Sequence, residues 1–402
     1  MSKPINILIA PDKMKGTLSA KEICEIIESV ALENNYVDSI GDSVKFNCTS
    51  LPLADGGDGS LSVLKNVLQL QKVNLKVKGP LLEPIRSHYA VDNKGNAYVE
   101  MAAAAGLVQV SPEKRNCMHT TSYGFGELIN HAISSGIKKV YLFLGGSATC
   151  DAGIGMATAL GYKFLDKEGK QIQPFGGQLN RVTKIELPQN LEVIKQTSFI
   201  TLYDVNNTIL GSQGAAPAFA PQKGANIQEV RILENGLTNI VELLKTNNDS
   251  FENIRPAKDD FQNLEQIRGG GAAGGMGLGT YAFLGAQLSP GTEEIMRLTK
   301  FSERIKNQNI IITAEGQIDK STLNGKVPFG VALEAKNRGI PCYVIGGSVK
   351  LMEMQKDQLD VIKWYSLSDS VGKVKSLSNP KGALSKVAKI MLEDIALHHS
   401  KI

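Results

Sequence analysis

Histidine, cysteine and long apolar runs are scarce in this chain of 402 residues. Its five histidines and five cysteines are scattered, and no two cysteines form a CxxC pair. This pattern disfavours a disulfide framework, a structural zinc site and a histidine-centred triad, and it fits a reducing cytoplasm. No apolar run approaches the ~20 residues that span a bilayer, and residues 1–16 lack the features of a signal peptide. We therefore expect a cytoplasmic protein without a membrane partner.

An excess of charge of one sign is also lacking. Lys and Arg number 44 against 40 Asp and Glu, which gives a net charge of +4 without any basic block. The sequence therefore offers no basic patch to which a nucleic acid could bind. The hydrophobic share of 42% is ordinary for a chain with a sizeable core and excludes intrinsic disorder. The oligomeric state cannot be read from the sequence.

Short β-branched runs alternate with helix-length amphipathic segments at both ends of the chain. The run at residues 5–10 precedes a helical pattern over 18–32, which starts with a capping box of Ser19 and Glu22. Near the other end, the run at 310–313 precedes a predicted helix over 327–337. Such alternation predicts a parallel sheet with helices on both faces.

The middle of the chain has a different pattern. It combines alternating strand-like segments with a predicted helix over 123–135 and a strong strand at 140–144. We therefore predict an α/β fold in which a Rossmann-like parallel sheet domain is formed by both chain ends and a second α/β domain is inserted. The predicted limits are 1–78 with 288–402 for the first domain and 79–287 for the second. A cleft between them is the expected site for a small ligand.

Glycine is abundant, with 40 residues, and it clusters with Asp and Lys after the predicted strands. Three such loops, at residues 11–17, 54–60 and 314–326, follow strands of the terminal domain, where open parallel sheets bind ligands. An Asp-Gly pair alone can be a simple turn, but three loops of this composition exceed what turns require. Glycine lets backbone N–H groups approach phosphate, Lys neutralises its charge, and carboxylates hold Mg²⁺ or orient a hydroxyl. The set favours phosphoryl transfer.

The inserted region adds four further segments whose residues could take part in binding or catalysis. Residues 144–151 leave a strand and open a helix, which makes them a candidate anion site. The others are residues 204–208, 221–225 and the glycine-rich 269–279. The last contains a GxGxxG pattern, but the polar residues before it are no buried strand, so the dinucleotide fingerprint is rejected. Two interpretations of it stay open: a flexible loop that covers phosphate, or close packing of small residues.

Two further sequence features are not interpreted as functional sites. Gly316 and Gly325-Lys326 do not have P-loop spacing, and Val327 stands where that motif needs Ser or Thr. Cys150 is interpreted as a small buried residue, because no histidine is near it in the sequence to activate it.

Eight segments in order along most of the chain resemble the bacterial glycerate kinase family of the two-domain α/β type. They are PDKMKGTLSA, PLADGGDGS, TSYGFGELI, LGGSATCDAGIGMATALG, DVNNTILG, APQKGA, GAAGGMGLG and AEGQIDKSTLNGK. Each is weak alone, whereas eight in sequence are specific. The resemblance implies phosphorylation of D-glycerate that depends on ATP and Mg²⁺, with 2-phosphoglycerate favoured over the 3-phosphate.

The residues and the resemblance together give a set of expected site residues. Expected catalytic residues are Lys15, Asp55, Asp204 and Asp319. Expected nucleotide-binding residues are Gly56, Gly57, Gly274, Gly275, Gly277 and Lys326. Expected substrate-binding residues are Ser147, Asp151, Asn206 and Lys223. Expected metal ligands are Asp58 and Glu315, although the division of roles among the carboxylates stays open.

Two alternatives also stay open. One is a kinase for a related small hydroxy acid or sugar acid, because pocket shape cannot be read from motifs. The other is a non-catalytic protein that binds an acidic metabolite. Anion binding alone would disfavour negative charge at the site, so the many carboxylates argue against this second alternative.

Overall fold

The computed structural model describes residues 4–247, 261–352 and 359–398. Its contacts divide the chain into two compact units, which we call the first unit (Met1–Asp55 with Thr292–Ile402) and the second unit (Gly56–Gly291). Both are α/β, as predicted. In this division residues 56–78 belong to the second unit, and the domain limits given above stay predictions.

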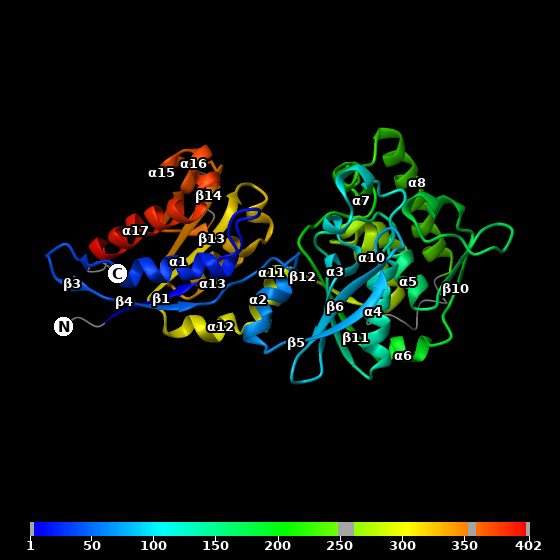
Figure 1. The fold of residues 1–402 in the computed structure, drawn as a ribbon, viewed down its shortest axis with the longest axis horizontal. Helices are drawn as coiled ribbons and strands as arrows, with labels where there is room; N and C mark the ends of the chain where they lie inside the picture. Colours follow the sequence, from blue (N-terminus) through cyan, green and yellow to red (C-terminus); the bar gives the residue numbers. More distant parts are fainter. Residues whose placement is uncertain (1–3, 248–260, 353–358, 399–402) are drawn as a thin grey trace. The chain divides into compact units, whose positions relative to one another are not determined.

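The first unit is built on a five-stranded sheet in which every pairing is parallel (Figure 1). In spatial order its strands are β15 (Lys363–Ser366), β14 (Cys342–Val349), β13 (Ile310–Ile318), β1 (Ile5–Ile9) and β4 (Phe46–Ser50). The chain passes from β1 to β4 on one side and then returns to β13 on the other side of β1. The order therefore reverses between β1 and β13, and doubly wound sheets bind ligands at the carboxyl ends of the strands at such a point.

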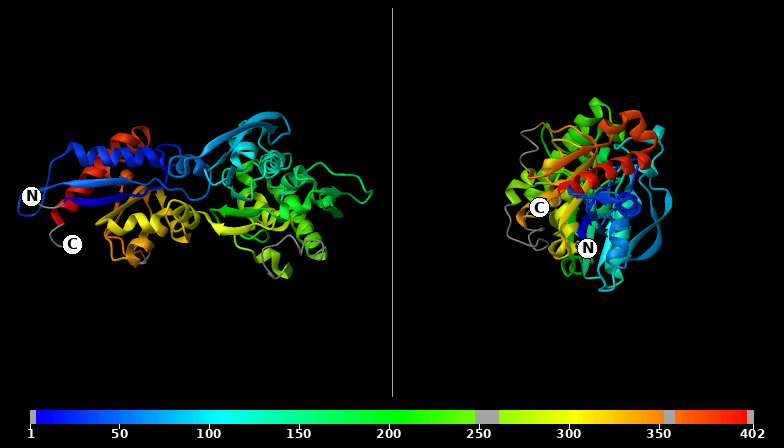
Figure 2. Two further views of the ribbon diagram at one scale, coloured as in Figure 1. Left: turned by 90° about the horizontal axis from the view of Figure 1, so that it is seen from below. Right: turned by 90° about the vertical axis from the view of Figure 1, so that its left-hand side faces the viewer.

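Helices cover both faces of this sheet (Figure 2). On one face, α1 (Ala20–Glu33) and α17 (Pro380–His398) lie side by side and bury alternate residues of β1, β13 and β14. On the other, α13 (Val327–Asn337) packs against β13 and β14. The remaining elements are α11 (Gly291–Leu298), α12 (Phe301–Arg304), α15 (Leu367–Val371), α16 (Lys373–Ser378) and the antiparallel pair β2 (Tyr36–Val37) and β3 (Ser43–Val44).

The predicted capping box at the start of α1 is confirmed. The Ser19 hydroxyl oxygen accepts the N–H of Glu22, and the Glu22 carboxylate accepts the N–H of Ser19. These two bonds satisfy backbone donors that the first turn of a helix leaves without partners. The helix that follows β1 thus begins at a fixed residue, which also fixes the length of the loop between them.

The second unit contains a six-stranded mixed sheet. In spatial order its strands are β12 (Gln287–Pro290), β11 (Ser198–Tyr203), β8 (Lys139–Phe143), β7 (Ala97–Glu100), β6 (Pro84–Val91) and β5 (Gln71–Lys78). The first four strands run parallel to one another, whereas β6 pairs antiparallel with β7 and β5 pairs antiparallel with β6. The carboxyl ends of β7, β8 and β11 therefore share one edge.

Helices and a small hairpin complete the second unit. The helices are α2 (Ser60–Val67), α3 (Ala102–Ala105), α4 (Tyr123–Ser134), α5 (Ile154–Ala159), α6 (Leu191–Lys195), α7 (Ala215–Phe219), α8 (Ile227–Thr246) and α10 (Ala272–Leu284). The hairpin joins β9 (Lys163–Leu165) to β10 (Lys184–Glu186). Within the described parts of the chain, no helix is both long and apolar enough to span a bilayer.

The glycine-rich segment corrects one interpretation. Residues 272–284 form α10, and nearly all of them are buried, so a flexible loop that covers phosphate is wrong and close packing is confirmed. Ala273, Gly274 and Gly275 have positive φ at its start. A Cβ on Gly274 would lie 2.2 Å from the Thr149 carbonyl oxygen, and one on Gly277 would lie 1.9 Å from that of Gly269. Packing thus accounts for these glycines, and a nucleotide contact by Gly274, Gly275 or Gly277 stays a prediction.

This packing predicts a loss of stability when a methyl group is added. Gly274→Ala should lower the free energy of unfolding by about 3 kcal/mol or more, because it combines a left-handed backbone with a clash against backbone atoms. Gly136→Ala is the matched control, since Gly136 has φ +87° but open space around its Cα; we expect a loss of about 1 kcal/mol. Urea unfolding measures both. Equal losses for the two variants would refute the packing role.

Candidate active site

Three carboxyl groups converge at the carboxyl edge of the first unit's sheet, and we call Asp12, Asp55 and Glu315 the acid cluster. Backbone hydrogen bonds continue the sheet beyond β1: Asp12 N–H donates to the Ala314 carbonyl (2.9 Å), and Leu53 N–H donates to that of Pro11 (2.9 Å). The three segments that carry the carboxyl groups are therefore in register with one another. The three residues are far apart in the sequence, and the fold brings their side chains together.

Burial and, to a lesser extent, repulsion by neighbouring carboxylates favour the protonated forms of Asp12 and Glu315. Asp12 is 4% exposed and Glu315 is 8% exposed. Burial, followed by the nearby Asp55 carboxylate, raises the pKa of Asp12 to about 8. Burial also raises the pKa of Glu315, although Lys326 opposes this. A carboxyl group whose pKa lies near neutrality can gain or lose a proton at working pH.

Lys326 pairs with the cluster from the start of α13. Its Nζ lies 2.9 Å from Glu315 Oε1, and the Thr322 hydroxyl donates to Glu315 Oε2 at 3.1 Å. Burial alone would lower the pKa of Lys326, but the Glu315 and Asp319 carboxylates outweigh it and raise that pKa. The ammonium therefore stays charged at the mouth of an acidic site.

Asp319 organises the loop between β13 and α13. Its Oδ1 accepts the N–H (2.8 Å) and the hydroxyl (2.6 Å) of Ser321, and its Oδ2 accepts from the Gln317 amide. Burial opposes ionisation of Asp319, but these hydrogen bonds prevail and lower its pKa. An ionised Asp319 thus fixes the loop that presents Lys326, and its predicted catalytic role stays a prediction.

A second group of predicted residues meets in the second unit. Lys223 is 3% exposed, and its Nζ donates to the Ser147 hydroxyl (2.8 Å) and the Thr149 carbonyl (2.7 Å). Burial lowers the pKa of Lys223, while nearby groups that include Asp151 and Asp204 oppose this. The ammonium thereby ties the loop after β8 to the segment that follows α7.

Asp151 lies in the interior of the second unit. Its Oδ2 accepts the N–H (2.8 Å) and the hydroxyl (2.7 Å) of Ser122, and its Oδ1 accepts the N–H of Gly153 (3.1 Å). The carboxylate thus joins the start of α4 to the start of α5. Cys150 beside it is completely buried, which confirms its interpretation as a small interior residue. A substrate contact by Asp151 stays a prediction.

Two of the predicted glycine loops touch within the second unit. A Cβ on Gly145 would lie 2.3 Å from the Gly57 Cα, and one on Gly56 would lie 2.7 Å from the Gly291 Cα. Close backbone packing therefore explains Gly56 and Gly145, and the nucleotide contacts of Gly56 and Gly57 stay predictions. Asp58 and Asn206 are exposed residues of this unit.

The structure thus sorts the predicted residues into two groups. Asp55, Glu315, Asp319 and Lys326 meet in the first unit, whereas Lys223, Ser147, Asp151 and Asp204 belong to the second, and a cleft shared by both stays a prediction. Asp12 was not among the predicted site residues. Its place directly after β1 was the signal that could have identified it. In the described residues, no set of three or more His, Cys, Asp or Glu side chains is arranged to hold a metal ion.

The raised pKa of Asp12 predicts how stability depends on pH. Between about pH 4 and pH 8 the folded protein binds more protons than the unfolded chain, so stability falls as pH rises through that window. Asp12→Asn removes the penalty, and it should raise the Tm by about 2 °C or more at pH 9 but leave it unchanged near pH 4. Thermal unfolding in EDTA without substrates measures this. The exposed Asp42→Asn is the control, and a Tm of Asp12→Asn at or below wild type at pH 9 would contradict the account.

Comparisons with known proteins agree with this architecture. The model of the glycerate kinase family matches residues 7–396. The glycerate kinase of Halalkalibacterium halodurans is 36% identical over 344 residues, and the glycerate 2-kinase of Escherichia coli K12 is 37% identical over 346 residues, with about 85% of each chain covered. A crystal structure described as glycerate kinase 2 from Salmonella typhimurium LT2 aligns over 100% of both chains, with a TM-score of 0.78 and 31% identity. The chain therefore belongs to the glycerate kinase family, and it is a phosphotransferase.

Proposed function

We propose that the protein transfers the terminal phosphoryl group of ATP to a hydroxyl of D-glycerate with the help of Mg²⁺, and that 2-phosphoglycerate is the favoured product. Relatives named glycerate kinase and glycerate 2-kinase support the acceptor. The observation that carries the proposal is the acid cluster beside a charged lysine, at the strand ends where doubly wound sheets bind ligands.

Asp12 is the group best suited to accept the proton of the attacking hydroxyl. It is buried beside two other carboxyl groups, and its pKa of about 8 makes it a stronger base than an ordinary Asp. The glycerate oxygen forms a bond to the terminal phosphorus, the bond from that phosphorus to the ADP oxygen breaks, and the hydroxyl proton moves to the Asp12 carboxylate. Charge on the transferred group is neutralised by Lys326.

The residues present also fit a divalent cation. Mg²⁺ usually takes one or two carboxylates and completes its shell with water and substrate phosphates. Three carboxyl groups that lie close together form such a donor set, and Asp55 with Glu315 would hold the ion. When bound, it would neutralise charge on the phosphates. Asp58, the other predicted ligand, belongs to the second unit.

The acceptor's carboxylate is expected at the lysine of the second unit. Lys223 is a buried lysine whose two hydrogen-bond partners, Ser147 and the Thr149 carbonyl, are neutral. A carboxylate bound beside it would favour the charged form that burial opposes. Asp204 and Asn206 follow β11 at the same sheet edge and are proposed to contact the acceptor's hydroxyl groups.

Two alternatives define the decisive assay. The purified protein is incubated with ATP, Mg²⁺ and one acid from a panel of D-glycerate, L-glycerate and related hydroxy and sugar acids, and the products are identified by ³¹P NMR. The proposal expects ADP release with D-glycerate and a phosphorus signal coupled to the proton on carbon 2. Faster turnover of another acid would favour the related-kinase alternative. Stabilisation by acids without any ADP release would favour a binding protein.

The pairing of Lys326 predicts the effect of removing its charge. Lys326→Met should lower kcat by about 100-fold, because a cation that stabilises the transferred phosphoryl group is lost. The control is Lys320→Met, an exposed lysine of the same loop, which should stay within about twofold of wild type. Steady-state kinetics measures both after thermal unfolding has established that each variant is folded. Equal rates for the two variants would refute the role of Lys326.

A further inference from the structure

A pocket of about 540 Å³ lies at the carboxyl ends of β1, β13 and β14, and we call it the β13–β14 pocket. Its walls come from the loop after β1, the ends of β13 and β14, and the short helices α15 and α16, which lie near these strands in Figure 1. It falls at the point where the strand order reverses. All of its lining residues belong to the first unit.

Side chains become smaller along the two strands toward the pocket. On the face that α1 and α17 cover, β13 presents Ile312 and Ala314 to the core and then Gly316. The neighbouring β14 presents Ile345 on that face and then Gly347. Side chains alternate between the two faces of a strand, so both glycines continue the core face, where backbone packs closely: a Cβ on Gly347 would lie 2.4 Å from the Gly316 carbonyl oxygen, and one on Gly316 would lie 3.3 Å from the Met14 Cα. The pocket lies beside these close-packed glycines, where the loop after β1 and the helices α15 and α16 form its other walls.

The pocket and the acid cluster lie on opposite faces of β13. Glu315 precedes Gly316 in the strand, so its side chain points to the other face, where Lys326 at the start of α13 pairs with it. The two sites nevertheless share their connecting segments, because Asp12 and Lys15 belong to one loop and Glu315 and Gly316 are consecutive. A ligand longer than glycerate can therefore reach from one site to the other around the strand ends.

The lining combines apolar surface with positive charge. Met14, Leu367 and Leu377 contribute apolar side chains, and three exposed lysines, which include Lys15 and Lys373, outnumber the one acidic residue, Asp369. This mixture suits a ligand that has a flat apolar part and several negative charges. Glycerate is too small to fill the volume and has no apolar face. A nucleoside triphosphate has the flat apolar part, its base, and the several negative charges, on its phosphates.

We propose that the β13–β14 pocket binds the base and ribose of the phosphoryl donor, and that Lys15 and Lys373 contact its phosphates. The terminal phosphate then lies at the acid cluster beside Lys326. This inference rests on the proposed function, since it names where the donor of that reaction binds. It also assigns Lys15 to the donor's phosphate chain and not to the acid cluster.

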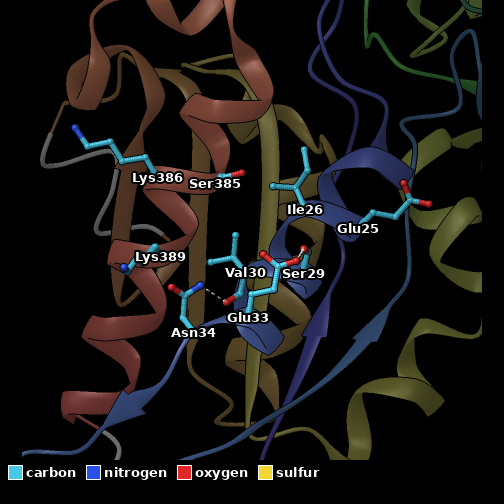
Figure 3. A pocket seen from close by; sticks show the side chains of 9 residues that line it. All are labelled: Glu25, Ile26, Ser29, Val30, Glu33, Asn34, Ser385, Lys386 and Lys389. Atoms are coloured by element: carbon cyan, nitrogen blue, oxygen red, sulfur yellow. Dashed lines mark hydrogen bonds between the residues drawn. The ribbon is translucent and has the colours of Figure 1, made fainter.

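A second pocket provides a matched control. It has a similar volume, about 530 Å³, and runs between α1 and α17, as Figure 3 shows. Lys386 and Lys389 line it from α17, and Glu25 and Glu33 line it from α1. Acidic residues balance its lysines, and no strand end reaches it, so we expect no nucleotide there.

Two pairs of variants in the full chain test the assignment. Lys373→Glu and Lys389→Glu change the net charge equally, one at each pocket. Ser368→Trp and Ser385→Trp introduce a large side chain in one pocket each. Isothermal titration calorimetry with ADP should give a Kd raised about 10-fold or more by Lys373→Glu and by Ser368→Trp. The two variants at the α1–α17 pocket should bind ADP as wild type does.

The outcomes separate this inference from the proposed function. ADP binding by folded Lys373→Glu and Ser368→Trp that equals wild type would overturn the pocket assignment, even if glycerate is phosphorylated. Weakened ADP binding in both, with no acid phosphorylated by wild type, would support the pocket and overturn the proposed reaction. For active protein, the assignment also requires a raised KM for ATP in Lys373→Glu, with the KM for glycerate unchanged.

Discussion

The architecture of the first unit depends on one constraint, which is that carboxyl groups that repel one another are held together in a buried place. Hydrogen bonds that continue the sheet past β1 fix the backbones of Asp12 and the segments beside it. These side chains cannot move apart without breaking that register. Burial, followed by repulsion from Asp55, raises the pKa of Asp12, so stability falls as pH rises from about 4 to about 8, and Lys326 offsets only part of the negative charge. A site that binds a cation and phosphate turns this unfavourable arrangement into binding and catalysis.

Local signals were sufficient to predict most elements of this unit. The helix over 327–337 was predicted with the bounds that the structure has, because an apolar run, a loop and a helix-length segment follow in order. Glu315 and Lys326 were also identified, since carboxylates and lysines after a strand are visible in the sequence. Asp12 was missed because its chemistry comes from burial beside Asp55 and Glu315, and contacts between distant segments are not encoded in local composition.

The glycine-rich segments also show that local composition does not determine which groups meet in the fold. The segment around Gly274 and Gly277 has the composition of a phosphate loop, yet it forms the start of a buried helix whose backbone lies against neighbouring backbone. Gly316, in a loop whose composition favours phosphoryl transfer, lines a pocket at the strand ends together with Gly347. Composition predicts where the chain can approach another group closely. Whether that group is the protein's own backbone or a ligand is decided by tertiary packing.

The most direct test of the central claim is the turnover of Asp12→Asn with its ADP affinity measured on the same preparation. If Asp12 accepts the proton of the acceptor hydroxyl, kcat falls by about 100-fold or more while the Kd for ADP stays close to that of wild type. Because the substitution relieves repulsion, the variant should be fully folded. A folded Asp12→Asn enzyme with wild-type kcat would contradict the account.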